Sequence, residues 1–139
     1  METLPERLRD AGYRMTQPRR QLMKILQGAE RPLSAEEILA AAGTSAIDLV
    51  TVYRNLAIFG ELGLIQTIQL ETGKQLFELQ ESENDHHHHI ICRSCHGVVR
   101  LDLCFGAELE KYARSLGFTQ LSHTIEVFGL CADCAGAEN

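Results

Sequence analysis

Two Cys-x-x-Cys pairs constrain this chain of 139 residues more strongly than any other feature. Cys92 and Cys95 form the first pair, and Cys131 and Cys134 form the second. Four thiolates paired in this way are typical of a closed, tetrahedral structural zinc site. Because 35 residues separate the pairs, more than in a compact zinc ribbon, we expect the ion to tie the first strand of a C-terminal domain to its last segment. Redox-active or unligated cysteines are the alternative interpretation.

A run of four histidines, His86 to His89, leads directly into the first Cys pair. In an extended strand successive side chains point to opposite faces, so the odd-numbered histidines point one way and the even-numbered ones the other. One strand can therefore serve two metal sites, and His123 offers a further imidazole from the last predicted strand. The fifth cysteine, Cys104, is expected to be a small half-buried residue rather than a ligand or a redox sensor.

The charge distribution places any anion-binding surface near the N-terminus. The net charge of −6 argues against an indiscriminate nucleic-acid binder. However, residues 1–80 hold 9 Lys and Arg against 10 Asp and Glu, whereas the remainder holds 4 against 9. The first 27 residues carry six basic side chains and only three acidic ones.

Apolar runs in this chain stay well below the roughly 18 residues that cross a bilayer, and the N-terminus lacks the apolar core of a signal peptide. We therefore expect a cytoplasmic protein with no membrane partner. In a reducing cytoplasm, the paired cysteines are better explained by zinc than by disulfides.

The first half of the chain carries start and stop signals for helices. Helices are predicted from about residue 4 to Gly12, after Thr16, from Ser34 to Gly43 and from Asp48 to Phe59. The sharpest signal is the capping-box spacing of Ser34 and Glu37. Residues 64–70 and 75–79 are then rich in apolar and β-branched side chains and are separated by a turn. Helices followed by a hairpin predict a winged helix.

The last of these helices has two different faces. Its apolar residues recur at spacings of three and four: Leu49, Val52, Leu56 and Phe59. Thr51 and Arg54 fall opposite this stripe and Tyr53 at its margin, since successive residues are about 100° apart. A solvated helix surface is what periodicity alone favours. Because Arg14 and Arg19 precede this helix-turn-helix-like succession, DNA binding is the sharper hypothesis.

A polar, aperiodic stretch that ends at Asp85 is typical of a linker. It predicts one domain over residues 1–80, a hinge at 81–85 and a second domain over 86–139. Strands are predicted in this second domain at 86–92, 98–102 and 123–128, and one helix face is formed by Leu109, Tyr112, Ala113 and Leu116 before Gly117. The fold class is therefore α+β.

Several motifs together resemble the ferric uptake regulator (Fur) family of bacterial metal-sensing repressors over nearly the whole chain. The matching segments are Thr16-Gln-Pro-Arg19, Leu33-Ser-Ala-Glu-Glu37, Thr51-Val-Tyr-Arg54, the segment from His86 to Cys95, and the segment from His123 to Cys131. The resemblance implies an N-terminal winged-helix DNA-binding domain and a C-terminal α/β dimerisation domain. The helix that carries Thr51, Tyr53 and Arg54 would enter the major groove, with Arg14 near the backbone or minor groove.

The same resemblance implies three sets of metal ligands. A structural zinc would be held by Cys92, Cys95, Cys131 and Cys134. A sensory site near the hinge would use Glu78, His87 and His89, with Asp102 as a candidate because Arg100 stands where the usual carboxylate falls. An inner site would use His86, His88, Glu108 and His123, although the family carboxylate aligns nearer Gly106 or Ala107.

The expected function is that of a homodimeric, metal-dependent repressor that closes onto a palindromic operator and controls metal-uptake genes. Imidazole and carboxylate ligands without a sensory thiolate suit Fe(II), Zn(II) or Mn(II), with Fe(II) slightly preferred. The alternatives are a zinc uptake regulator and a peroxide- or manganese-sensing relative. From other classes, a zinc-dependent hydrolase is less well matched because no His-Glu-x-x-His signature is present. A metal-storage module would not need the helix that bears Thr51 and Arg54. Neither an enzymatic activity nor a small-molecule substrate is expected.

Overall fold

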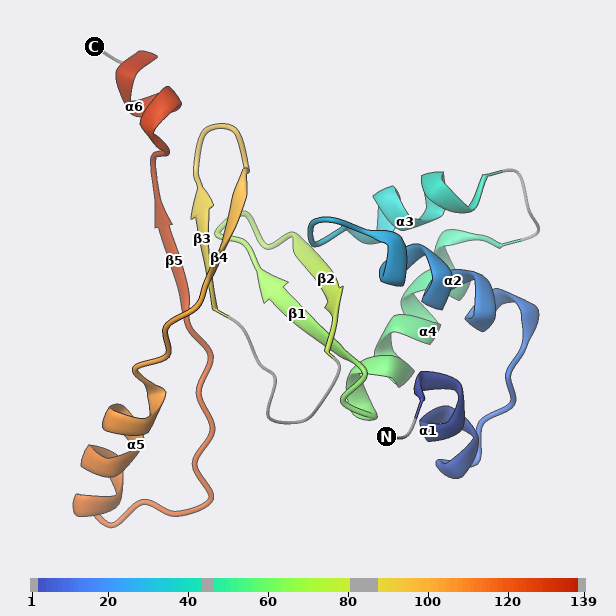
Figure 1. Ribbon diagram of the computed structural model, residues 1–139, viewed down its shortest axis with the longest axis horizontal. Coiled ribbons are helices and arrows are strands. Elements are labelled where there is room, and N and C mark those ends of the chain that lie inside the picture. The colour runs from blue at the N-terminus through green and yellow to red at the C-terminus, as the bar shows by residue number, and fades with distance from the viewer. Residues whose placement is uncertain (1–2, 44–46, 81–87, 138–139) are drawn as a thin grey trace. The chain divides into compact units, whose positions relative to one another are not determined.

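A computed structural model describes residues 3–43, 47–80 and 88–137 (Figure 1). Its contacts divide the chain into two compact units, Met1–His86 and His87–Asn139. The expected hinge at 81–85, together with His86 and His87, lies outside the described residues. Within the described ranges, no helix is both long and apolar enough to span a bilayer.

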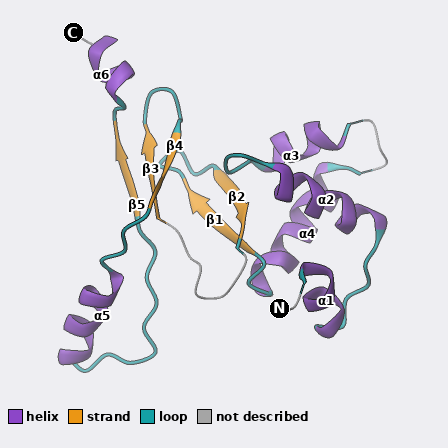
Figure 2. Ribbon diagram, viewed as in Figure 1, coloured by secondary structure: helices purple, strands orange, loops and turns teal. Residues whose placement is uncertain are grey.

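The first unit consists of helices followed by a two-stranded sheet (Figure 2). Its elements are α1 (Leu4–Asp10), α2 (Gln17–Gly28), α3 (Ala35–Ala42), α4 (Leu49–Glu61), β1 (Ile65–Gln69) and β2 (Gln75–Leu79). The strands pair antiparallel, with Ile65 opposite Leu79 and Gln69 opposite Gln75. This is the element order expected of a winged helix, and the mixed helix and sheet class agrees with the prediction.

Side-chain caps explain where these helices begin. Thr3, Thr16, Ser34 and Asp48 each accept a hydrogen bond from the backbone N–H three residues later. The predicted cap at Thr16 and the predicted capping box of Ser34 and Glu37 are both confirmed. Caps of this kind stabilise a helix by about 1 kcal/mol each, so the helix starts are determined locally.

The hydrophobic core of the first unit lies between α2, α3, α4 and the hairpin. As predicted, α4 buries Val52, Leu56 and Phe59, while Leu49 is only partly buried. The guanidinium of Arg7 donates to the carbonyl of Leu62 at 2.9 Å and holds α1 against the end of α4. This core fixes the orientation of α4, so the opposite face of that helix is presented to solvent.

The second unit is a three-stranded sheet with two helices. Its elements are β3 (His88–Cys92), β4 (Val98–Leu101), α5 (Gly106–Ser115), β5 (Glu126–Gly129) and α6 (Ala132–Ala137). The central strand β3 pairs antiparallel with β4 and parallel with β5. Within this unit, α5 lies beyond one end of the sheet and α6 beyond the other (Figure 1).

Two details of the second unit differ from the sequence prediction. The last strand begins at Glu126 rather than at His123, because the chain is still irregular where the ring of His123 meets other side chains. The short helix α6 is absent from the prediction, because its six residues, rich in alanine, carry too few periodic apolar positions for a signal.

The second unit has very little interior of its own. Among the buried hydrophobic residues of the described chain, only Ile91 and Cys92 belong to it. Its large hydrophobic side chains are instead exposed: Ile90, Val99, Leu103, Phe105, Leu109, Tyr112, Leu116, Phe118, Val127 and Leu130. The apolar stripe predicted on α5 is therefore real, but it faces solvent in the single chain. An exposed apolar surface of this kind is typical of a protein interaction site.

Candidate functional site

The four paired cysteines come together at one end of the sheet. Their sulfur atoms all lie within 4.8 Å of one another, and the Sγ atoms of Cys95 and Cys131 are 3.9 Å apart. In a tetrahedral zinc site with Zn–S bonds of about 2.3 Å, neighbouring sulfurs are about 3.8 Å apart. The donor set and its spacing therefore fit a zinc ion bound by four thiolates.

Local backbone structure positions these four thiols. Cys92 ends β3, and Cys95 sits in the tight turn that follows, where His96 has a φ of 61°. Cys131 follows β5, and Cys134 lies in α6. A Cβ atom on Gly97 would lie 3.3 Å from the Cys95 sulfur, so the turn leaves little room for a larger residue.

The backbone prepares one of these thiols for ionisation. The amide of Cys131 donates to the Cys92 sulfur at 3.4 Å. This bond, together with a backbone bond from Cys95, lowers the pKa of Cys92 to about 6. The neighbouring Cys131 side chain instead raises the pKa of Cys134 to about 12. Further thiolate charge can therefore accumulate only with a cation among the sulfurs.

A second cluster combines His88, Cys104 and His123. The Nε2 atoms of the two histidines are 3.2 Å apart, and the Cys104 sulfur lies 3.2 Å from the first and 3.3 Å from the second. His88 is buried, and the other two side chains are more accessible. Each residue offers one ligand atom, so this group too could hold a metal ion.

The surroundings of His123 hold its ring in place. Its Nδ1 lies 3.1 Å from a carboxylate oxygen of Glu110 on α5. On its other side is the buried Gly106, where an added Cβ would come within 2.1 Å of the imidazole. The amide of Gly106 also donates to the Cys104 sulfur at 3.3 Å. The start of α5 therefore supports two members of the cluster at once.

The other predicted metal ligands lie elsewhere. His89 is buried on β3 opposite Arg100 and Glu126, and Asp102 is exposed. Glu108 is exposed on α5, and Glu78 is partly buried on β2 in the first unit. Neither described cluster includes any of these four predicted residues. His86 and His87 lie outside the described residues.

Sequence reasoning misses one member of the second cluster and the carboxylate that contacts it. Cys104 is not the half-buried filler that the sequence predicts, because it is exposed and contacts both histidines. Glu110, not Glu108, meets His123. Once the structure places the helix start at Gly106, residues four apart share one helix face, so Glu110 lies on the side of Gly106 and Glu108 is turned away.

The predicted DNA-binding side chains lie in the first unit, and they differ in their exposure and in their hydrogen bonds. Tyr53 and Arg54 are exposed on α4, Thr51 is partly buried, and Arg14 is exposed before α2. The Tyr53 hydroxyl donates to a carboxylate oxygen of Glu36 at 3.4 Å. The outward face of α4 thus presents a phenol and a guanidinium to solvent.

The side chain of Arg19 forms contacts within the first unit. Its Nε donates to Oδ1 of Asn55 at 2.9 Å, and its Nη1 donates to the carbonyl of Arg14 at 2.8 Å. Its guanidinium also stacks 5.4 Å from the centre of the Tyr13 ring. Arg19 therefore joins α2 to α4 and fixes the backbone at Arg14, the residue whose carbonyl it contacts.

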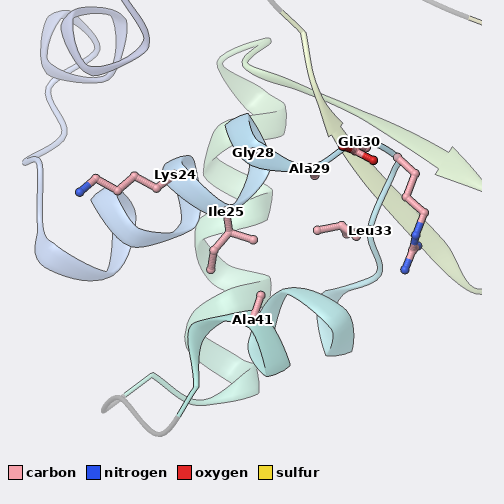
Figure 3. A pocket seen from close by; sticks show the side chains of 8 residues that line it. Lys24, Ile25, Gly28, Ala29, Glu30, Leu33 and Ala41 are labelled. Atoms are coloured by element: carbon pink, nitrogen blue, oxygen red, sulfur yellow. The ribbon is translucent and has the colours of Figure 1, made fainter.

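The first unit also contains a shallow, largely apolar cavity of about 620 Å³ beside α2 and α3 (Figure 3). Its lining residues are Lys24, Ile25, Gly28, Ala29, Glu30, Arg31, Leu33 and Ala41. The Lys24 ammonium points away from it (Figure 3). This lining has neither a metal-binding donor set nor a nucleophile with a base, so the cavity lacks the groups of a catalytic site.

Comparison with known proteins places these features together. The family model described as "Ferric uptake regulator family" matches residues 10–128. The ferric uptake regulation protein of Bordetella parapertussis is 36% identical over 91% of this chain and 93% of its own length. The zinc uptake regulation protein of Mycobacterium tuberculosis is 35% identical over 89% of this chain and 96% of its own length. The crystal structure of the Vibrio cholerae ferric uptake regulator is similar with a TM-score of 0.73 and 32% identity, covering 89% of this chain and 96% of that chain.

Proposed function

The chain belongs to the ferric uptake regulator family, and from this premise we propose that it is a homodimeric, metal-dependent DNA-binding repressor of metal-uptake genes in the cytoplasm. Family membership makes it a metal-responsive regulator rather than an enzyme. The observation that carries the finer proposal is the outward face of α4, where exposed Tyr53 and Arg54 stand opposite a buried stripe.

The position of that face supports a role in DNA recognition. A helix whose apolar face is packed on a core can enter a major groove without changing its orientation. Guanidinium and phenol groups on its outer face can then form hydrogen bonds with base edges and phosphates. The exposed Arg14 adds a basic contact before α2. The overall charge of −6 limits indiscriminate binding, so recognition depends on this face.

A second copy of this chain is the proposed cover for the exposed apolar side chains of the second unit. Leu109, Tyr112 and the C-cap residue Leu116 are each at least 57% exposed and recur on one face of α5 and its C-terminal end. The unit buries too few residues to be stable alone, and a two-fold partner offers the same apolar surface in return. A dimer also supplies two recognition helices for a palindromic operator.

Two kinds of metal have different roles in this proposal. The four cysteines hold a permanent structural Zn(II), since a closed tetrahedral thiolate site leaves no open position. A reversible sensory ion is bound by His87, His89 and Glu78, with Asp102 as the candidate fourth ligand, and the donor set slightly favours Fe(II) over Zn(II) and Mn(II). To act as a switch, this ion must bind the DNA-competent form of the dimer more tightly than the other form.

The test is DNA binding at buffered free metal concentrations. The protein, with its structural zinc retained, is titrated with Fe(II), Zn(II) or Mn(II) against a library of duplexes that contain randomised AT-rich palindromes. We expect one metal to raise affinity for a selected palindrome at least about tenfold. If the dimer selects no duplex with any of the three metals, the repressor proposal is wrong.

Matched variants separate the roles in that assay. Arg54→Ala should weaken binding of the selected palindrome, whereas Lys111→Ala removes the same charge from exposed α5 and should not. His89→Ala should abolish metal activation while leaving one structural zinc per chain. Unchanged activation in His89→Ala would remove that residue from the sensory site.

A second candidate function is that of a zinc uptake regulator, because the zinc uptake regulation protein of Mycobacterium tuberculosis is 35% identical to this chain and the ferric uptake regulation protein of Bordetella parapertussis is 36% identical. In that case Zn(II), not Fe(II), would activate DNA binding in the same titration. A hydrolase would instead require an open metal position beside a general base.

A further inference from the structure

We propose that His88, Cys104 and His123 form a second zinc site, in which the Cys104 thiolate takes the position that the family resemblance gives to a carboxylate. Neither DNA nor the sensory ligands take part in it. It therefore goes beyond the proposed function, and it can be tested without an operator.

The spacing of the three ligand atoms matches the edges of a coordination tetrahedron. Zinc bound to imidazole nitrogens at about 2.0–2.1 Å and to sulfur at about 2.3 Å sets these atoms about 3.3–3.6 Å apart. The observed separations are 3.2 Å between the two Nε2 atoms, and 3.2 Å and 3.3 Å from them to the Cys104 sulfur. A metal ion at the centre needs almost no movement of the three side chains.

The hydrogen bond at the far side of His123 orients its lone pair. A carboxylate can only accept, so the 3.1 Å contact between Glu110 and Nδ1 places the ring proton on Nδ1. The Nε2 lone pair then points toward His88 and Cys104. A carboxylate behind a ligating imidazole is the usual outer partner in zinc sites and makes the imidazole a better donor. We assign this role to Glu110.

The start of α5 provides for the sulfur as well. The amide of Gly106 donates to the Cys104 sulfur at 3.3 Å, which holds the sulfur beside the two imidazoles. Glycine is needed at this position, because any Cβ would overlap the ring of His123. Gly106 thus leaves space for the imidazole and also donates a hydrogen bond to the sulfur.

The donor set determines which ion is preferred. Two imidazoles and one thiolate suit Zn(II), whereas Fe(II) and Mn(II) favour sites richer in oxygen donors. Zinc at this site would join β3, the segment after β4 and the segment before β5. That connection strengthens a unit with very few buried side chains of its own.

Cobalt(II) provides a specific test, because it replaces zinc and gives a near-ultraviolet charge-transfer band only when a thiolate binds it. The chain has five cysteines, and four of them are occupied once the four-cysteine site is loaded with zinc. Cobalt added to this zinc-loaded, reduced protein should therefore produce the band through Cys104 alone. Stoichiometric Zn(II) should bleach it, and equal Fe(II) or Mn(II) should not.

Variants identify the ligands in the same titration. Cys104→Ser should abolish the band, and Glu110→Gln should weaken cobalt binding about 10- to 100-fold. Glu108→Gln is the matched control, since it changes the exposed carboxylate on the same helix, and it should leave the band unchanged. Cys104 is exposed, so its serine variant should fold, and circular dichroism checks this.

Three outcomes would overturn the proposal. The wild-type protein could bind cobalt without a charge-transfer band, the band could persist in Cys104→Ser, or it could appear only as zinc is released from the four-cysteine site. A loss of the band in Glu108→Gln would contradict the role assigned to Glu110, since Glu108 would then be the carboxylate that supports the site. Operator binding is not measured here, so failure of this site leaves the repressor proposal to its own test.

Discussion

Arg19 and Asn55 are joined across two helices: Nε of the arginine on α2 donates to Oδ1 of the buried asparagine on α4 at 2.9 Å. The Asn55 amide then donates to the carbonyl of Thr51 one turn earlier at 3.0 Å. Through this chain of bonds, the position of α2 is coupled to the part of α4 that carries Thr51. Arg19 therefore supports the recognition helix, while Arg54 remains available on its surface.

The two arginines should differ when each is replaced by alanine. Arg19→Ala leaves the buried Asn55 oxygen without its donor, so it should lower the free energy of unfolding of the first unit by about 1–3 kcal/mol as well as weaken DNA binding. Arg54→Ala should weaken DNA binding with little effect on stability. Urea unfolding and anisotropy with the selected palindrome measure both quantities. Equal stability losses in the two variants would contradict the support role of Arg19.

Gly106→Ala should displace the ring of His123. A Cβ at this position would lie within 2.1 Å of the imidazole, so His123 must move away from His88 and Cys104. We expect the affinity of this cluster for cobalt(II) to fall by at least about tenfold, while the zinc of the four-cysteine site is retained. Gly136→Ala is the control, because a Cβ there meets no atom within 4 Å. Equal cobalt affinity in both variants would show that the ring position does not matter.

Cys95→Ser should remove the structural zinc and with it the folded second unit. Three thiolates and a hydroxyl bind zinc far more weakly than four thiolates, and the unit has little hydrophobic core to compensate. Zinc analysis and size-exclusion chromatography should show a zinc-depleted, non-dimeric protein. Arg93→Ser, an exposed change in the same turn, should keep both properties. A stable zinc-free dimer of Cys95→Ser would contradict the structural role.

Leu109→Glu should separate the dimer. The residue is 57% exposed on the apolar stripe of α5, and burying one leucine in an interface contributes about 1.5–3 kcal/mol. The dissociation constant should therefore rise at least about tenfold, as measured by analytical ultracentrifugation. Lys111→Glu introduces the same side chain on the same helix away from this stripe and should leave the dimer intact. If both variants remain dimeric, the partner binds elsewhere.

Glu37 should make the first unit sensitive to acid. The Arg31 guanidinium, and then the backbone and hydroxyl of Ser34, lower its pKa from 4.5 to about 2. A lowered pKa means that the charged form is favoured by folding, so this contribution is complete above pH 4.5 and is lost as the pH falls toward 2. Because the pair is partly exposed, the contribution is about 0.5–1 kcal/mol.

Glu37→Gln keeps an oxygen for the capping box but removes the titration. Its free energy of unfolding should thus approach that of the wild type as the pH falls from 4.5 to about 2. Urea unfolding at several pH values measures this, and comparison between variants cancels the acid release of zinc. A constant gap for Glu37→Gln would contradict the role of its charge.

The helix starts and the hairpin were predictable because their signals are local. Ser34 caps the N–H of Glu37, and this depends only on residues three apart. The turn between β1 and β2 likewise lies within one short segment. Pairing of the Cys-x-x-Cys motifs was also predictable, because few chemical roles other than zinc binding require two such pairs.

The composition of the second cluster depended on long-range geometry. Cys104 reaches His88 because Leu101 pairs with His88 across the hairpin, so the chain that leaves β4 passes that end of β3. Glu110 faces His123 because α5 begins at Gly106, whereas the apolar pattern of the sequence marks the helix only from Leu109. The exposure of the apolar side chains on α5 could not be predicted either. Periodicity identifies an apolar face but does not show whether the same chain covers it.

The two metal clusters sit at opposite ends of the same parallel strand pair. His88 and Cys92 are the first and last residues of β3, about 13 Å apart along an extended strand, and His123 and Cys131 flank β5. Bringing these distant segments together costs loop-closure entropy. Binding of the first ion offsets this cost for both ends of the strand pair. The second ion then binds to segments that are already aligned. The clusters should consequently load cooperatively, each strengthening the other without sharing a single atom.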